Sequence, residues 1–181
     1  MKKEQETLTI ETNLTSTLKF IKEQLYDKCG FRLTNLNAHL ESADYGACSF
    51  QLNGKRVEHR LSKITPTKTG QFVTLWKRNS LGKTEPFTIS DGIDFVVITS
   101  KSGSKAGQFI FPAAVLAEKG IISQNNKKGK LGIRVYPSWD RPTSRQAQTT
   151  QNWQKNFFVT IEQDDTTNLD RVKKIINGHS F

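Results

Sequence analysis

The 181-residue chain is 35% hydrophobic and 24% charged, a composition that predicts a soluble globular protein folded as one domain. No apolar run approaches the roughly 18–20 residues that cross a bilayer, and residues 1–13 lack the apolar stretch of a signal peptide. We therefore expect a cytoplasmic protein that does not bind membranes. Cys29 and Cys48 lack CxxC spacing, so we expect two reduced, buried thiols.

The net charge of +10 is unevenly distributed along the chain. Residues 31–159 hold 19 of the 27 basic residues and eight of the 17 acidic ones, whereas the two ends together hold eight basic and nine acidic residues. A positive field of this kind attracts phosphates, which favours nucleic acid as the partner. The alternative is that the charge serves only solubility.

The first part of the chain predicts a helix followed by an antiparallel meander. Leu14, Leu18, Ile21 and Leu25 recur at helical spacing, so we expect a helix over 13–29 that ends at Gly30. Residues 31–45 are expected to form an irregular link. Asn53-Gly54 predicts a tight hairpin. The meander would contain strands over 46–52, 57–64 and 71–77, with a turn over 65–70.

The second part predicts a buried strand and several helices. Residues 93–100, IDFVVITS, form a near-continuous apolar run that is typical of a central strand. The other expected elements are a loop over 79–92, strands over 107–111, 131–136 and 159–161, and helices over 113–119 (opened by Pro112), 144–157 and 168–177. This order predicts an α+β or mixed α/β fold with a central mixed sheet flanked by helices, in a single domain over 1–181 whose core spans about 13–158.

The most basic stretch is residues 55–78, where seven of 24 residues are Lys or Arg and only Glu58 is acidic. Basic residues neutralise phosphates and interleaved aromatic side chains stack bases, so this pattern favours backbone-led nucleic-acid binding with little sequence preference. The candidate binding residues are Arg60, Lys63, Lys68, Trp76, Lys77, Arg78, Arg134, Trp139, Arg141 and Arg145. The competing interpretations place Trp76 in the core and pair Arg134 with Asp140 or Asp94. They also leave Arg141 and Arg145 as plain surface charge at the start of a helix, whose free amides favour anions. Helix 144–157 is expected to present its glutamines on its polar side.

Four blocks of the sequence resemble the MepB family. They are KITPTKTGQFVTLWKR (63–78), GQFIFP (107–112), GIRVYPSWD (132–140) and TQNWQKNFF (150–158), in order along most of the chain. The family is named after a gene beside a bacterial multidrug efflux pump. The resemblance implies a fold similar to that of PD-(D/E)XK nucleases, a degenerate nuclease site and nucleic-acid binding.

The nuclease comparison assigns counterparts to the metal-binding residues. The superfamily places an Asp on one strand and (D/E)-x-K on the next, where carboxylates hold Mg²⁺ and the lysine offsets charge on the phosphate. The counterparts here would be Asp94 and Gln108-Phe109-Ile110, with Glu41 as a further carboxylate. Ile110 has neither charge nor donor, and only Lys63 or Lys77 from another strand can replace the lysine.

We therefore expect no metal site, no cofactor and no hydrolysis. A metal-dependent nuclease that uses Mg²⁺ is the first alternative. A protein-interaction or small-molecule response module linked to multidrug efflux is the second. We expect a monomer whose partner is DNA or RNA, with no small-molecule substrate, and the preferred nucleic acid stays open.

Overall fold

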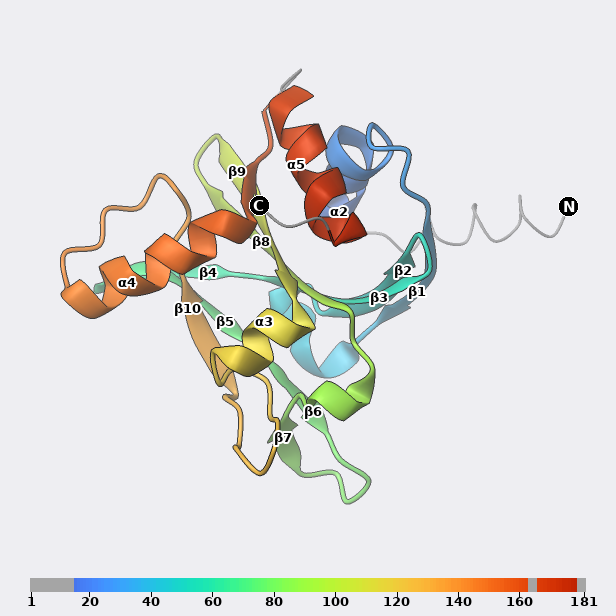
Figure 1. Cartoon of the computed structure of the whole chain (residues 1–181), viewed down its shortest axis with the longest axis vertical. Helices are drawn as coiled ribbons and strands as arrows, with labels where there is room; N and C mark the ends of the chain where they lie inside the picture. Colours follow the sequence, from blue (N-terminus) through green and yellow to red (C-terminus); the bar gives the residue numbers. More distant parts are fainter. Residues whose placement is uncertain (1–14, 163–165, 179–181) are drawn as a thin grey trace, which may run out of the picture.

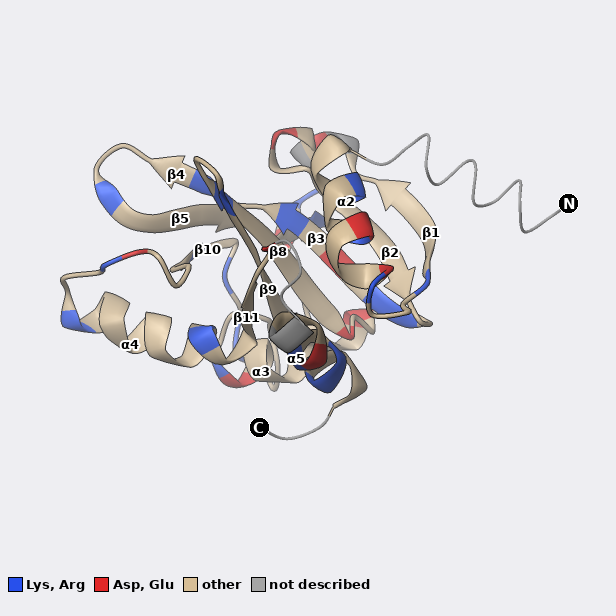
Figure 2. Cartoon of the chain, turned by 90° about the horizontal axis from the view of Figure 1, so that it is seen from above, with Lys and Arg blue, Asp and Glu red and all other residues tan. Residues whose placement is uncertain are grey.

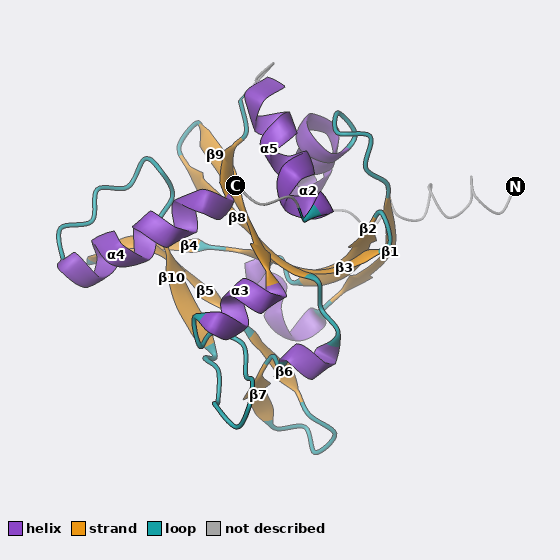
Figure 3. Ribbon diagram, viewed as in Figure 1, coloured by secondary structure: helices purple, strands orange, loops and turns teal. Residues whose placement is uncertain are grey.

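The computed structural model describes residues 15–162 and 166–178, and it shows a mixed α+β fold (Figures 1 and 3). Within the described residues, the largest sheet has six strands in the order β1-β2-β3-β8-β9-β11. These are β1 (Leu33–Ala38), β2 (Cys48–Leu52), β3 (Lys55–Leu61), β8 (Phe95–Ser102), β9 (Lys105–Pro112) and β11 (Phe158–Thr160). The pair β3 and β8 is parallel, and every other neighbouring pair is antiparallel. The expected mixed sheet is confirmed.

Both faces of the large sheet are covered. One face packs against α2 (Ser16–Ile21) and α5 (Thr166–Asn177). The other packs against α3 (Ala113–Glu118) and a second sheet of β10 (Gly132–Val135), β5 (Lys68–Thr74) and β4 (Lys63–Thr65). In β8, Phe95 and Val97 join the first core cluster while Val96 and Ile98 join the second. Because successive strand residues point to opposite faces, the continuous apolar run confirms the predicted buried central strand.

The first helix forms where periodicity predicts it. Thr15 caps its start, because the Thr15 hydroxyl accepts a hydrogen bond from the Leu18 amide. After α2 the chain continues as a π-helical turn, Lys22–Tyr26, and Gly30 stops it with a φ of +73°. Residues 13 and 14 of the predicted helix lie outside the described part.

The expected irregular link over 31–45 is wrong, because it contains β1 and a 3-10 helix, Leu40–Tyr45. Strand β1 is at the edge of the sheet, where its polar residues remain exposed and leave no clear alternating pattern. Asn35 has a φ of +55°, and the register with β2 shifts there. A non-glycine residue in this conformation interrupts regular strand geometry, which further conceals β1 in the sequence.

The expected three-stranded meander is also wrong in its third strand. The hairpin at Asn53 and Gly54 is confirmed, with φ values of +49° and +78°. However, β3 pairs on its other side with β8, and β5 belongs to the second sheet. Ser62 forms the corner between the sheets: its amide donates to the Thr99 carbonyl, and its hydroxyl bonds to Gln71 Oε1 at 2.7 Å.

Three further boundaries differ from expectation. The predicted loop over 79–92 contains β7 (Thr84–Pro86), which pairs with β6 (Trp76–Arg78), and a 3-10 turn, Ile89–Asp91. Pro112 ends β9 in an extended conformation and caps α3, so it lies outside the helix. The predicted helix over 144–157 is α4 (Arg145–Gln154) followed by a 3-10 turn, Lys155–Phe157.

The glutamines of α4 attach the helix to the sheet. Gln151 and Gln154 are buried, although polarity predicts an exposed face. Gln154 accepts a hydrogen bond from the Tyr136 amide at 2.9 Å and donates to the Arg134 carbonyl at 3.0 Å, as a neighbouring strand would. Gln151 donates to the carbonyls of Pro137 and Asp140. Both buried amides therefore bond to backbone groups, as buried polar side chains generally do.

Candidate functional site

The three residues proposed for a degenerate nuclease site do not come together. Asp94 accepts a hydrogen bond from the Arg56 amide at 2.8 Å and so starts the parallel pairing of β3 with β8. Gln108 lies opposite Thr99 on β8, five residues beyond Asp94, which is about 16 Å along a strand. Glu41 is exposed and pairs with Arg78 at 2.8 Å.

Gln108 belongs to a buried polar network instead. Its Oε1 accepts from the Tyr26 hydroxyl at 2.8 Å and its Nε2 donates to the Thr99 hydroxyl at 3.0 Å. Thr99 also bonds to His59 Nε2 at 3.0 Å. Burial raises the pKa of Tyr26 and lowers that of His59 to about 4, so both side chains are neutral near pH 7. Both polar atoms of the Gln108 amide are engaged, which makes it part of the core.

The acid-x-base triplet that a strand does present is Glu58-His59-Arg60 on β3. Glu58 Oε2 lies 3.2 Å from Arg60 and 3.3 Å from His39 Nε2. This triplet lies on β3, whereas the counterparts that the nuclease resemblance implies lie before β8 and on β9. The sequence did contain a signal: Glu58 and Arg60 are two apart and therefore share one face of a strand.

Glu58 and Arg60 line a pocket of about 630 Å³. We call it the paired-charge pocket, since three of its four cations are matched by carboxylates: Arg60 lies beside Glu58, Lys77 contacts Asp91 and lies 3.3 Å from Glu85, and Arg78 pairs with Glu41. The hydrogen bond to Asp91 raises the pKa of Lys77. The paired-charge pocket is lined by Ala38, His39, Glu41, Arg56, Glu58, Arg60, Trp76, Lys77, Arg78, Phe87, Asp91 and Ile93.

Four of the predicted binding residues therefore lie in this pocket: Arg60, Trp76, Lys77 and Arg78. Arg60 is only 3% exposed, and burial lowers its pKa while Glu58 opposes that shift. The Arg78 guanidinium lies 5.3 Å from the centre of the Trp76 ring. Ion pairs and ring contacts already occupy these cations, so a phosphate would have to compete with carboxylates for them.

The remaining predicted residues are dispersed. The Lys63 ammonium lies over the Tyr45 ring at 4.2 Å. Trp139 is half-buried and meets Phe158 edge-on, with the two ring centroids 5.5 Å apart, so it packs against the second core cluster. Arg141 and Arg145 are exposed near the start of α4, and Figure 2 shows Lys and Arg residues along the β4-β5 hairpin and near both ends of this helix.

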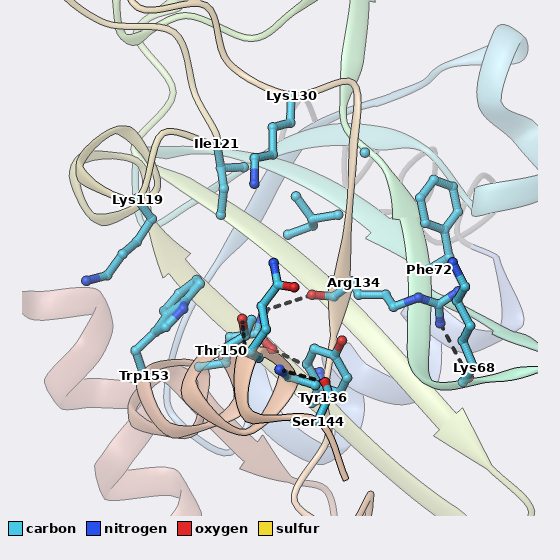
Figure 4. Close-up of a pocket in the computed structure, with 15 residues that line it drawn as sticks. Lys68, Phe72, Lys119, Ile121, Lys130, Arg134, Tyr136, Ser144, Thr150 and Trp153 are labelled. Atoms are coloured by element: carbon cyan, nitrogen blue, oxygen red, sulfur yellow. Dashed lines mark hydrogen bonds between the residues drawn. The ribbon is translucent and has the colours of Figure 1, made fainter. Parts of the chain in front are cut away.

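Lys68 and Arg134 lie in a different depression, of about 580 Å³, between the second sheet and α4 (Figure 4). We call it the basic groove. Four cations line it: Lys68, Lys119, Lys130 and Arg134. The other lining residues, all uncharged, are Phe72, Ile121, Gly132, Ile133, Tyr136, Ser144, Gln146, Ala147, Thr150, Trp153 and Gln154. None of the lining residues, all in the described part of the chain, is acidic.

Most of the cations that line the groove have no carboxylate partner. Arg134 donates to the Gly70 carbonyl at 3.1 Å and to the Thr65 hydroxyl at 2.8 Å, which are neutral partners. Lys119 pairs with its exposed neighbour Glu118 at 3.4 Å, a contact of little energy at such a site. Across the described residues, no carboxylate lies within ion-pair distance of Lys68, Lys130 or Arg134. Within this part of the chain, three of the four groove cations therefore have no carboxylate partner.

Sequence reasoning missed Lys119 and Lys130 as members of this site. They lie 51 and 62 residues after Lys68, and no local pattern links them. Fold contacts place them there: the Lys130 amide donates to the Ile121 carbonyl at 2.9 Å, and the Lys119 ammonium lies 5.9 Å from the Trp153 ring centre. The one available signal was the basic run of residues 124–130.

In residues 15–162 and 166–178, no three His, Cys, Asp or Glu side chains are grouped so as to hold a metal ion. No helix in these ranges combines the length and apolar character needed to cross a bilayer.

Comparisons with known proteins agree on one family. A family model described as MepB-like matches residues 39–160. The crystal structure of MepB superimposes with a TM-score of 0.71 and is 29% identical in sequence, covering 83% of this chain and 100% of that one. A search of curated proteins found no match.

Proposed function

This chain belongs to the MepB-like family, and we propose that it is a nucleic-acid-binding protein whose basic groove contacts the phosphate backbone. The observation that carries the proposal is the composition of the groove, in which four cations and no carboxylates line one concave surface. Phosphate binding depends on cations that are free to release counterions and approach the backbone. The groove cations meet that condition better than the paired cations around Trp76.

The contacts expected from this groove favour backbone binding over base reading. Lys68 and Lys130 are exposed, flexible point charges, which neutralise a phosphate without requiring a particular base. Arg134 is held by the Gly70 carbonyl of β5 and the Thr65 hydroxyl of β4, so its guanidinium stays in place at the groove wall. We therefore expect similar affinity for strands of different sequence.

We assign no hydrolytic step to the protein. The amide of Gln108 is engaged by Tyr26 and Thr99, and Ile110 is fully buried in the core. Neither side chain can hold a metal or offset charge on a phosphate. The function that we propose is therefore nucleic-acid binding without hydrolysis.

The test is fluorescence anisotropy of labelled DNA and RNA at several salt concentrations. We expect affinity to fall steeply between about 50 and 200 mM salt, because bound phosphates displace counterions. The double variant Lys68→Glu/Lys130→Glu should weaken binding about tenfold or more and reduce the salt slope by about two, one for each lost phosphate contact. No change in affinity with salt would contradict a phosphate-led mode.

The matched control changes net charge by the same amount outside the groove. Lys55→Glu/Lys83→Glu alters two exposed lysines of the β2-β3 and β6-β7 hairpins. This control should lose much less affinity than the groove variant. Equal losses would show that net charge, and not the groove, attracts the nucleic acid.

A further inference from the structure

The shape of the basic groove limits what it can enclose. A volume of about 580 Å³ is in the range of pockets that hold one drug-sized molecule, so the groove is small beside a nucleic-acid duplex. Its walls are α4 on one side and β5 with β10 on the other. A duplex is a stiff rod with both backbones on its outside, so it can touch the rim of such a groove but cannot enter it.

Aromatic side chains lie among the cations of the groove. Phe72 comes from the sheet and Trp153 from α4, and both are half-buried. Figure 4 shows them at opposite ends of the groove. Each has a basic neighbour: Arg134 is the cross-strand partner of Phe72, and the Lys119 ammonium lies 5.9 Å from the Trp153 ring centre.

The fold leaves space for Phe72 to lie along the sheet. A Cβ atom on Gly132 would meet the Phe72 ring at 2.7 Å, so the glycine allows this ring to cover β10. Lys68 and Phe72 both come from β5, and both line the groove. The groove therefore places cations for a backbone beside aromatic surface for bases.

We infer that the basic groove binds single-stranded nucleic acid in preference to duplex. This inference rests on the proposed function of the same groove. Unpaired bases stack on aromatic side chains while cations follow their backbone, whereas bases in a duplex are stacked on one another and cannot reach Phe72 or Trp153. Because every base has a π-face, DNA and RNA single strands share the chemistry that the groove recognises.

The test compares labelled single strands of about 12 nucleotides, as DNA and as RNA, with blunt duplexes of the same sequence at equal ionic strength. We expect the wild-type chain to bind the single strands about tenfold or more tightly than the duplexes. The DNA and RNA arms identify which strand is preferred. This comparison needs no variant and therefore does not depend on a variant that folds.

Substitution then locates the preference. Phe72→Leu keeps apolar cover over Gly132 but removes the π-face, so the ratio of single-strand to duplex affinity should fall toward one. Trp153→Leu should act in the same direction, with circular dichroism to check folding, because Trp153 also packs against Phe111. Loss of the preference in Trp76→Leu but not in Phe72→Leu would place the strand in the paired-charge pocket and overturn the inference.

The outcomes separate this inference from the proposed function. Equal or tighter binding of duplexes, still abolished by Lys68→Glu/Lys130→Glu, would overturn the single-strand preference and leave nucleic-acid binding in place. Absence of binding to any strand at low salt would overturn both. A single-strand preference that Phe72→Leu lowers would support both.

Discussion

Burial of the His59 side chain makes the stability of the fold depend on pH. Its ring is fully buried between the Gly46 carbonyl, 3.1 Å from Nδ1, and the Thr99 hydroxyl, 3.0 Å from Nε2. Burial, opposed by the Gly46 hydrogen bond and aided by Arg60, lowers its pKa to about 4. The other titratable groups nearby are Cys48, whose sulfur is 3.7 Å from Nδ1, and the Glu58 carboxylate beside Arg60. The core therefore accepts this ring only in its neutral form.

We expect acid to destabilise the protein through His59. In the unfolded chain the His59 pKa is near 6.5, so between about pH 6.5 and 4 the unfolded state binds more protons and stability falls as pH falls. The loss attributable to this ring reaches about 3 kcal/mol near pH 4 and grows no further below it. Urea unfolding at several pH values should show a shallower dependence in His59→Gln than in the wild type. An equal dependence in the two proteins would show that His59 does not carry this acid sensitivity.

At the scale of elements, α4 is held to β10 by a side-chain amide. Gln154 bonds to the Tyr136 amide and the Arg134 carbonyl, and both contacts are in or near the core. The same contact holds the two walls of the basic groove at a fixed separation. This contact therefore contributes both to the stability of the interface and to the shape of the groove.

Replacement of Gln154 by leucine should weaken both the interface between α4 and β10 and the binding of nucleic acid in the groove. The Tyr136 amide would be left buried without a partner, which costs about 1–3 kcal/mol. We expect Gln154→Leu to lower the free energy of unfolding by about that amount and to weaken binding of single strands. Thr149→Ala, at an exposed position of α4, is the control. Unchanged stability in Gln154→Leu would show that these hydrogen bonds do not hold the helix.

At the scale of the whole molecule, the position of the cations that lack a carboxylate partner matters more for polyanion binding than the net charge does. The +10 of the chain includes cations bound to carboxylates around the paired-charge pocket and cations without them in the basic groove. Folding thereby divides a broadly basic sequence into a neutralised region and a positive one. A polyanion that binds the folded chain should find its strongest field at the groove.

Binding should therefore stabilise the folded molecule. At about 100 times its Kd, a single strand adds about 2.7 kcal/mol of stability, which raises Tm by about 5–10 °C in a chain of this size. The shift should vanish at about 0.5 M salt, where surface charges are screened, and in Lys68→Glu/Lys130→Glu. Differential scanning fluorimetry measures it. An equal shift in that variant would mean that the strand binds elsewhere.

Much of the fold could be predicted because its signals are local. The apolar period of α2, the Asn53-Gly54 turn and the apolar run of β8 each lie within one stretch of chain, and the structure confirms all three. Strand β1 was missed because an exposed edge strand needs no apolar alternation. The parallel partner of β3 was missed because the two paired strands are far apart in the sequence, and no local pattern specifies which strands pair.

The sequence by itself determined the fold class, the family resemblance and the positive charge of the middle of the chain, because composition, periodicity and motif blocks are properties of neighbouring residues. Only the tertiary structure decided which charges are free. It placed Lys77 against Asp91 and Arg78 against Glu41, and it brought Lys68 and Lys130 together across 62 residues. Ion pairing depends on distances of a few ångströms between side chains, and chain order alone does not specify such distances.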